Sequence, residues 1–320
     1  MYDVITIGGA SQDIYLESEQ FKKIKDKKIL EKFAAGLPSE AKTEIENAFF
    51  ETGGGGTNSA CTFSRLGLGT AYLGNVGDDK EGAEIKKQLK KEKVSTSLIK
   101  TDPDDKTAFS IILVSPTQKR IILVFRGAEK DLKLTDAELK KLKTKWFYIT
   151  SLAGNLKLLK QIIDFAGKNK IKVAANPGQK ELSQKEKLKP ILEKIDILIL
   201  NLKEANEFSG QNEIEKMAEK ILADFNGILV ITLGAKGAIA FDRKNIFQIK
   251  TEAKKNVKDT TGAGDAFGSG FVTGIILKSD ISFGLQLGVA NARAVLEKIG
   301  AKKGLLKNIP KKFNYKVETK

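Results

Sequence analysis

The sequence predicts an α/β protein with a mostly parallel central sheet. Short runs rich in β-branched residues alternate with amphipathic segments along most of the chain, which is the pattern of repeated βαβ units. The chain has 320 residues, enough to bury a substantial core as one large domain or as one domain with a smaller appendage.

The expected elements follow one another in the order of such units. Strands are predicted at residues 3–7, 71–76, 146–150, 172–175, 195–200 and 228–233. Helices are predicted at residues 57–66, 81–91, 156–169 and 214–223. A β-hairpin over residues 238–249 is expected to turn at 242–245, and helices at 265–277 and 281–299 are expected before a lysine-rich tail.

Two segments do not fit the alternation. Residues 14–52 and 105–127 contain strand-like runs, at 109–114 and 120–125, that would form a poor parallel crossover, and the first segment has a helix-like stretch at 21–33. We therefore expect residues 1–13, 53–104 and 128–320 to form the main domain, and the two exceptional segments to form a smaller one.

Composition excludes several classes of chemistry. The chain has no histidine, which excludes histidine-based triads, histidine-ligated zinc and histidine general bases. Acid–base work must fall to Asp, Glu, Lys or Tyr. Cys61 is the only cysteine, so there is no internal disulfide, as expected in a reducing cytoplasm. The N-terminus enters a strand directly and no run approaches about 20 apolar residues, so we expect a cytoplasmic protein without signal peptide or membrane span.

The formal charge of +15 raises the question of nucleic-acid binding. However, the excess is mostly lysine spread along predicted helices, where it alternates with leucine and glutamate as on solvated helix faces. There is no arginine-rich stripe with interleaved aromatic residues. We therefore expect no nucleic-acid partner, and a basic surface that attracts anionic substrates.

The most informative motif is Asp-Thr-Thr-Gly-Ala-Gly-Asp-Ala-Phe at residues 259–267. Gly262, Ala263 and Gly264 stand at the start of a predicted helix, where unpaired backbone N–H groups and the helix dipole favour a phosphate or a developing anion. A carboxylate at this place, Asp265, is suited to accept a proton from a hydroxyl that attacks the phosphate. The structural alternative is a plain glycine-rich turn in which Asp265 only stabilises the helix start.

On this motif the chain resembles the ribokinase-like (PfkB) family of sugar and nucleoside kinases. The resemblance implies a three-layer α/β/α fold with a small β-sheet lid, formed here by residues 14–52 and 105–127, over the acceptor substrate. It implies ATP as the phosphoryl donor, Mg²⁺, Asp265 as the catalytic base, and the backbone of Gly262, Ala263 and Gly264 as the anion hole. It also implies a monovalent cation such as K⁺ near Asp259.

The glycine run at residues 53–56 is followed by Thr57 and Asn58. It is neither a Walker A loop nor a dinucleotide-binding fingerprint, because the required spacings are missing. By itself it fits a flexible loop as well as a ligand site. The resemblance places Gly54 and Asn58 at the sugar hydroxyls, and Asp13, just beyond the first strand, at the position of the acceptor-binding Asp.

Asn201 and Glu204 follow the strand predicted at 195–200 and form a capping-box pattern, which needs no further function. The resemblance instead implies that they order Mg²⁺ and its waters. Thr232, Gly234 and Gly237 allow a tight turn, which the family uses against the ATP phosphates and ribose.

Three further residues are weaker candidates. Asn291 matches a family position near the adenine. Arg126 and Asn176 each end a predicted strand and could face the acceptor, where an arginine would suit a carboxylate or phosphate, although a surface arginine is the commoner case.

We interpret the chain as an ATP-dependent kinase that phosphorylates a hydroxymethyl group of a small sugar or sugar derivative. The alternative within the family is a nucleoside kinase of the adenosine type, whose base would need walls from aromatic residues such as Tyr15, Phe49, Phe50, Phe109 or Phe125. A non-catalytic sugar- or nucleotide-binding regulator is disfavoured because it would not need Asp265. Exposed strands of the lid would favour a homodimer.

Overall fold

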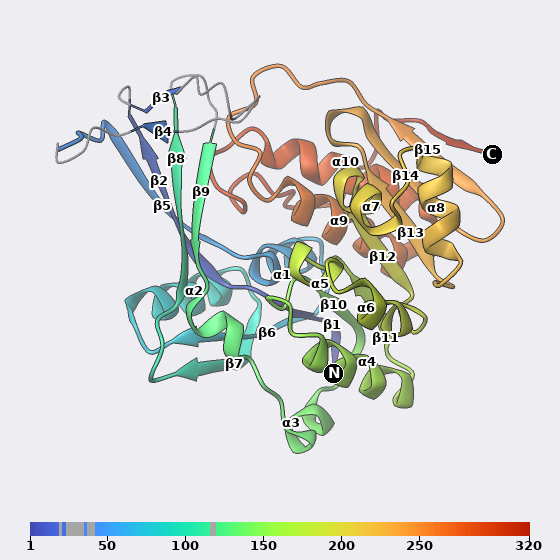
Figure 1. Ribbon diagram of the computed structural model, residues 1–320, viewed down its shortest axis with the longest axis horizontal. Coiled ribbons are helices and arrows are strands. Elements are labelled where there is room, and N and C mark those ends of the chain that lie inside the picture. The colour runs from blue at the N-terminus through green and yellow to red at the C-terminus, as the bar shows by residue number, and fades with distance from the viewer. Residues whose placement is uncertain (19–20, 24–34, 37–41, 116–119) are drawn as a thin grey trace.

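The computed structural model describes residues 1–18, 21–23, 35–36, 42–115 and 120–320 (Figure 1). A ten-stranded sheet forms the centre of the main domain, and its first seven strands in spatial order from one edge are parallel to one another. They are β7 (Ser95–Asp102), β6 (Thr70–Gly77), β1 (Tyr2–Ile7), β10 (Thr144–Ile149), β11 (Lys172–Ala175), β12 (Ile197–Asn201) and β13 (Ile228–Thr232). Antiparallel strands β14 (Gly237–Phe241), β15 (Ile246–Lys250) and β16 (Val317–Thr319) complete the sheet.

Helices cover both faces of this sheet, because alternate residues of its strands belong to two separate cores. In β1, Val4 packs with α9 (Ala263–Lys278) and α10 (Ile281–Val295), whereas Ile5 and Ile7 pack with helices on the opposite face. That face carries α4 (Leu156–Lys168), α5 (Gln179–Leu182), α6 (Lys185–Leu192), α7 (Leu202–Ser209) and α8 (Ile214–Leu222). Helix α1 (Gly55–Arg65) contacts α9, α2 (Lys80–Lys91) contacts β7, and α3 (Asp136–Lys141) precedes β10. The predicted three-layer α/β/α architecture is confirmed.

A second, smaller sheet stands beside the main one (Figure 1), with the strand order β5 (Asn47–Gly53), β2 (Ser11–Glu17), β8 (Ala108–Val114) and β9 (Arg120–Phe125). Strands β2 and β8 are parallel, and the other two pairs are antiparallel. The strands predicted at 109–114 and 120–125 are therefore confirmed as β8 and β9. Of the helix-like stretch at 21–33, residues 24–33 lie outside the described residues, and Lys22–Lys23 form strand β3, which pairs with β4 (Ala35–Gly36).

All six strands predicted for the main sheet are present within a few residues of their expected bounds, and the hairpin turns at Asp242, whose amide donates to the Asn245 carbonyl at 3.1 Å. Short 3₁₀ turns lie at Gly127–Asp131 and Gly234–Lys236. Within the described ranges, no helix is long and apolar enough to cross a membrane.

Candidate active site

Residues from both sheets surround a cavity of about 320 Å³, here named the first cavity. The second sheet contributes residues of β2, β8 and β9, and the main sheet contributes residues that follow β10 and β11. The carboxyl ends of parallel strands are where ligands collect in α/β proteins. The charged and amide side chains that line the first cavity are Asp13, Asn58, Arg126, Glu129, Asn176, Glu204 and Asp265.

A cavity of about 310 Å³, the second cavity, lies beside the β13–β14 turn and the helices α9 and α10. Thr232, Gly234 and Gly237, which were predicted to contact the nucleotide, all line this cavity. The charged side chains in its wall include Lys254 and Arg293.

The N-terminus of α9 is shared by the two cavities. Gly262 and Asp265 line the first cavity, whereas Ala263 and Gly264 line the second. Gly262 has a left-handed backbone with φ of 74°, and a Cβ atom there would lie 2.4 Å from the Ala301 Cβ, so the turn requires glycine. The backbone of this first helical turn therefore borders both cavities, and its Ala263 amide donates to the Thr260 carbonyl at 3.3 Å.

Asp265 is enclosed although it faces the first cavity. Its Oδ2 accepts a hydrogen bond of 2.8 Å from the Asn58 side-chain amide, which comes from α1. Burial raises the pKa of Asp265, and the Asn58 hydrogen bond and the Lys302 ammonium partly offset this. Asn58 was predicted at the sugar hydroxyls, and the structure places its side-chain amide against the Asp265 carboxylate. Among the described residues, its Oδ1 atom has no hydrogen-bond partner.

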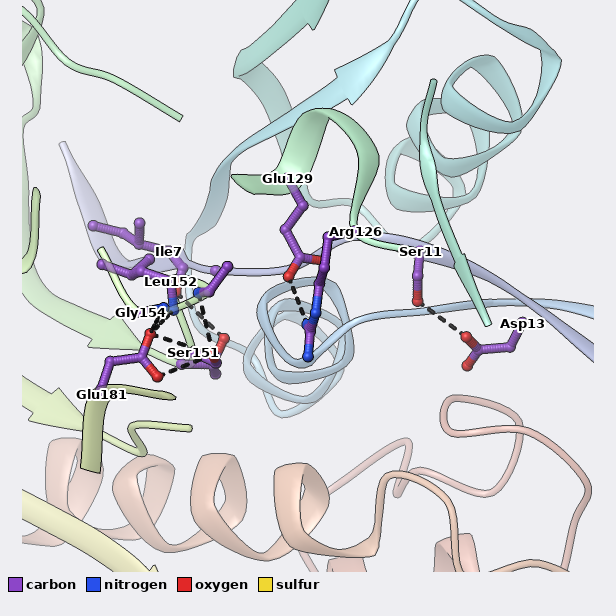
Figure 2. A network of polar contacts seen from close by, with 12 residues as sticks. Ile7, Ser11, Asp13, Arg126, Glu129, Ser151, Leu152, Gly154 and Glu181 are labelled. Carbon is purple, nitrogen blue, oxygen red and sulfur yellow. Dashed lines mark hydrogen bonds and ion pairs between the residues drawn. The ribbon is translucent and has the colours of Figure 1, made fainter. Parts of the chain in front are cut away.

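Asp13 lies in β2, with its carboxylate buried at the cavity wall. Ser11 Oγ donates to its Oδ1 at 3.0 Å (Figure 2), and burial raises its pKa while Lys302 partly offsets the rise. A Cβ at Gly53 would lie 2.0 Å from Asp13 Oδ2. The predicted residue Gly54, with φ of 93°, brings the loop against the Gly9 carbonyl. The glycines of this loop therefore make room for Asp13 and for the Gly8–Gly9 turn.

Arg126, which was predicted as a residue that could face the acceptor, lines the first cavity, but its charge is already paired. Its guanidinium donates to Glu129 at 3.0 Å (Figure 2), and the Glu129 side chain is only 8% exposed. Burial raises the pKa of Glu129, which Arg126 partly offsets. Glu129 was not predicted, because a lone glutamate after a strand gives no signal in the sequence. Asn176 lines the same cavity and donates to the Ile199 carbonyl at 2.8 Å.

Another carboxylate, that of Glu181, holds the loop that follows β10. Glu181 accepts hydrogen bonds of 2.7 Å from the amides of Leu152 and Gly154, and Ser151 Oγ donates to it at 3.2 Å (Figure 2). This contact fixes the loop that carries Thr150 and Ser151 into the cavity wall.

Asn201 and Glu204 form a capping box at the start of α7, which was one of the two roles considered for them from the sequence. Asn201 Oδ1 accepts from the Glu204 amide at 2.9 Å, and Glu204 Oε2 accepts from the Asn201 amide at 2.8 Å. Glu204 also lines the first cavity, and burial raises its pKa. The capping role is therefore present, and the carboxylate still faces the cavity.

The expectation for Asn291 is not supported. Its side chain is fully buried, donates to Thr62 Oγ1 at 3.2 Å and to the Ala266 carbonyl at 2.8 Å, and accepts from the Leu306 amide at 3.0 Å. These bonds hold α1, α9 and the C-terminal segment together. Val289, Ala292, Arg293 and Leu296 of the same region line the second cavity instead.

Two basic residues that the sequence analysis missed lie next to the motif. Arg120 of β9 forms an ion pair with Asp259. Lys302 is buried, and its ammonium donates to the Thr52 carbonyl at 2.7 Å. The monovalent cation implied at Asp259 does not fit these contacts, because that carboxylate already has a cationic partner.

Two cavities that meet at the N-terminus of one helix, with a carboxylate in the wall of the first, form the arrangement expected of a phosphotransferase, which needs room for a donor and for an acceptor. The model of the pfkB family carbohydrate kinases matches residues 23–308, and the chain belongs to this family. This confirms the predicted resemblance and the predicted activity, that of an ATP-dependent kinase of a sugar hydroxyl.

Individual relatives cover most of the chain. A ribokinase of Haemophilus influenzae is 29% identical over 79% of this chain and 83% of its own length, and a 5-dehydro-2-deoxygluconokinase of Bacillus licheniformis is 26% identical over 77% and 81%. Among solved structures, Arabidopsis thaliana ribokinase complexed with ribose and ATP superposes with a TM-score of 0.79 at 20% identity, covering 95% of each chain. Burkholderia thailandensis nucleoside kinase in complex with inosine gives 0.75 at 18% identity, covering 94% of each. These structures share the fold.

Proposed function

We propose that the first cavity binds a sugar acceptor, that the second binds the nucleotide of ATP, and that Asp265 takes the proton of the attacking hydroxymethyl group. The observation that carries this proposal is the N-terminus of α9, which is shared by the two cavities and has Asp265 on the acceptor side. The second sheet would then act as the lid of the acceptor site, with residues 14–52 and 105–127 as its segments.

The chemistry follows from this placement. The hydroxyl oxygen of the acceptor forms a bond to the γ-phosphorus as the bond to the β-phosphate oxygen breaks, and the hydroxyl proton passes to Asp265. Because burial raises the pKa of Asp265, its carboxylate is a stronger base than an exposed one. The N-terminus of α9, formed by Gly262, Ala263 and Gly264, would lie beside the negative charge on the transferred group, where the positive end of the helix dipole is favourable.

The second cavity suits a nucleotide. Phe267, Val289 and Leu296 offer an apolar wall for a base, and the cationic side chains of Lys254 and Arg293 suit phosphates. Glycines at 234 and 237 keep those two positions of the β13–β14 turn free of side chains at the cavity wall, which Thr232 and Ala235 also line. Support for ATP binding thus comes from both the apolar and the cationic side chains that line the cavity.

Mg²⁺ is compatible with the residues present. In the part of the chain that the structure describes, no cluster of three metal-ligating side chains occurs. Mg²⁺ in kinases usually keeps several waters and is held by one or two carboxylates together with the phosphates, so one cavity carboxylate is a sufficient protein contribution. Glu204, with Asn201 beside it, is the residue that would hold it. When bound, the ion neutralises charge on the phosphates.

The charges of the first cavity favour a neutral polyhydroxyl acceptor. Asp13 and Glu129 can accept hydrogen bonds from hydroxyl groups, and so can Asn58 Oδ1, which has no partner among the described residues. Arg126 is already paired with Glu129. A nucleoside is the second candidate because Phe109 and Phe125, whose ring centroids are 5.0 Å apart, also line this cavity. ATP consumption measured against sugars, sugar acids, sugar phosphates and nucleosides decides between them. Turnover with a sugar acid or phosphate alone would contradict the neutral acceptor.

A homodimer through the lid is supported by the edge strand β9. Its residues Ile122, Leu123 and Val124 are each 52% exposed. An exposed apolar edge strand is a template for pairing with another chain. Sedimentation of the wild-type protein tests this, and a monomer at micromolar concentration would contradict it.

Replacing Asp13 by alanine is expected to weaken acceptor binding far more than ATP binding. Each lost hydrogen bond to a charged group costs roughly 1.5–3 kcal/mol, so acceptor affinity should fall at least tenfold. Calorimetric titration of each substrate checks this. The control is Glu17→Ala on the same strand, whose carboxylate accepts from Asn47 and does not line the cavity. Loss of ATP affinity with intact acceptor affinity would show that the two cavities are assigned wrongly.

Replacing Glu204 by glutamine is expected to raise the Mg²⁺ concentration needed for turnover without changing the melting temperature. Glutamine can still accept a hydrogen bond from the Asn201 amide, so the cap survives while the carboxylate charge is lost. Turnover measured over a range of Mg²⁺ concentrations checks this. Glu207→Gln, on the same helix but half-exposed, is the control. An unchanged Mg²⁺ requirement in Glu204→Gln would leave Asn201 and Glu204 with the capping role alone.

A further inference from the structure

Arg120 connects the second sheet to the loop that precedes α9. It is the first residue of β9, and its Nη1 donates to Asp259 and, at 2.9 Å, to Thr261 Oγ1. The Arg120 side chain is 15% exposed and that of Asp259 is 2% exposed. A guanidinium from the acceptor-side sheet therefore lies buried beside the motif.

The Asp259 carboxylate organises the start of the anion site. The Thr261 amide donates to Oδ1 at 2.7 Å, and the Gly300 amide donates to Oδ2 at 2.8 Å. Burial by itself would raise the pKa of Asp259, but these amides and Arg120 hold it below its ordinary value. Gly262 follows Thr261 directly, so these contacts fix the backbone from which the left-handed turn begins.

Further contacts anchor the second sheet to the segment after α10 that contains Gly300. Ile299 packs against the apolar cluster of Tyr15, Ile112 and Val114 in β2 and β8. Lys303 forms an ion pair with Glu51 of β5. Arg120 is thus one of several ties, and it bonds directly to the motif loop.

We propose that Arg120 takes the place of the monovalent cation implied at Asp259, and that this kinase therefore needs no added K⁺. The inference rests on the proposed function, since the loop that Arg120 holds is the proposed anion site. Arg120 is a positioning residue, because it contacts Asp259 and Thr261 and not the reacting atoms.

The electrostatic reason is simple. A buried, uncompensated carboxylate near the anion site would repel the phosphoryl charge, and a fixed cation beside it removes this repulsion. Either a bound K⁺ or a guanidinium can supply one positive charge. The guanidinium is covalently part of β9 and does not dissociate, and a K⁺ ion added next to it would meet a like charge. The same strand carries Val124 and Phe125 into the first cavity, so Arg120 also fixes part of the acceptor wall.

The first test is turnover as a function of K⁺ at constant ionic strength, with tetramethylammonium as the replacement cation. Wild-type kcat is expected to stay constant. Arg120→Gln is expected to lose roughly 10- to 100-fold in kcat, and added K⁺ should restore part of this loss saturably. Arg120→Lys keeps the charge and should retain most of the turnover without K⁺. Arg243→Gln, in the exposed hairpin turn, is the control.

The second test does not depend on activity. In amide hydrogen exchange of the protein without substrates, Arg120→Gln is expected to increase exchange at Thr261 and Gly300, whereas Arg243→Gln should not. A saturable rise of wild-type turnover with K⁺ would overturn the proposal, as would full turnover of Arg120→Gln without K⁺. If the wild-type protein transferred no phosphoryl group under any condition, the proposed function would fail, and unchanged exchange in Arg120→Gln would separately refute the role of Arg120.

Discussion

Replacing Asp265 by asparagine is expected to abolish phosphoryl transfer while both substrates still bind. The amide matches the carboxylate in shape, so the helix start and the turn at Gly262 should survive. What is lost is a basic oxygen that can take the acceptor proton, and the chain has no histidine to replace it. Loss of a general base costs roughly 10²–10⁴ in rate, and the loss should appear in kcat because the proton moves only as the transition state forms.

Single-turnover transfer at saturating ATP and acceptor is the measurement. Asp280→Asn is a matched control, because Asp280 caps the neighbouring helix α10 through the Phe283 amide and asparagine can cap equally well. The Asp265 variant should also lose the acid limb of the pH–kcat profile. In the wild type this limb lies above the ordinary pKa of an aspartate, because burial raises the pKa of Asp265 and only the ionised form accepts the proton. Near-normal turnover in Asp265→Asn would refute the mechanism.

The sequence predicted the interior of the fold better than its edges. The strands of the parallel core are short apolar runs because helices cover both their faces, and that pattern is visible in one sequence. Strands β7 and β16 were not predicted. Both are edge strands with a row of half-buried or exposed polar residues, for example Ser95 and Lys100 in β7, and therefore resemble loops.

For the site, the sequence predicted what is local and missed what depends on distant contacts. The turn at Gly262 and the base Asp265 lie within one motif. Asn58, by contrast, meets Asp265 across 207 residues, and Arg120 meets Asp259 across 139. Asn291 lies on α10, the helix expected near the nucleotide, but its side chain points toward α1 and α9 and not toward the second cavity. Helical periodicity alone does not decide between those two directions for a polar residue.

Lys302 is a buried residue whose lysine-rich local sequence gave no sign of its burial. It stands in a lysine-rich segment, which resembles a solvated tail, and its neighbour Lys303 is indeed 57% exposed. Yet the Lys302 side chain is buried, with Nζ bonded to the carbonyl and hydroxyl of Thr52 at 2.7 and 3.1 Å. Burial lowers the pKa of Lys302, and the carboxylates of Asp13 and Asp265 partly offset this. The same ammonium favours the ionised forms of both carboxylates.

Replacing Lys302 by methionine is therefore expected to move the acid limb of the pH–kcat profile to higher pH. Without the ammonium, the pKa of Asp265 rises further, so the base becomes protonated, and turnover falls, at a higher pH than in the wild type. Acceptor affinity should weaken in the same direction, because Asp13 loses the same compensating charge. The variant should also unfold more easily, by about 1–3 kcal/mol, since the Thr52 carbonyl and hydroxyl are left buried without their donor.

The pH–rate profile is the decisive measurement, because a packing defect alone would lower stability without moving the acid limb. Lys303→Met is the matched control: it removes the adjacent lysine, whose partner Glu51 lies outside the first cavity, and should leave the limb in place. Comparison at a temperature well below both melting points separates folding from catalysis. An acid limb that stays at its wild-type pH in Lys302→Met would show that the buried ammonium does not control the ionisation of Asp265, and that its role is confined to holding Thr52 and the second sheet.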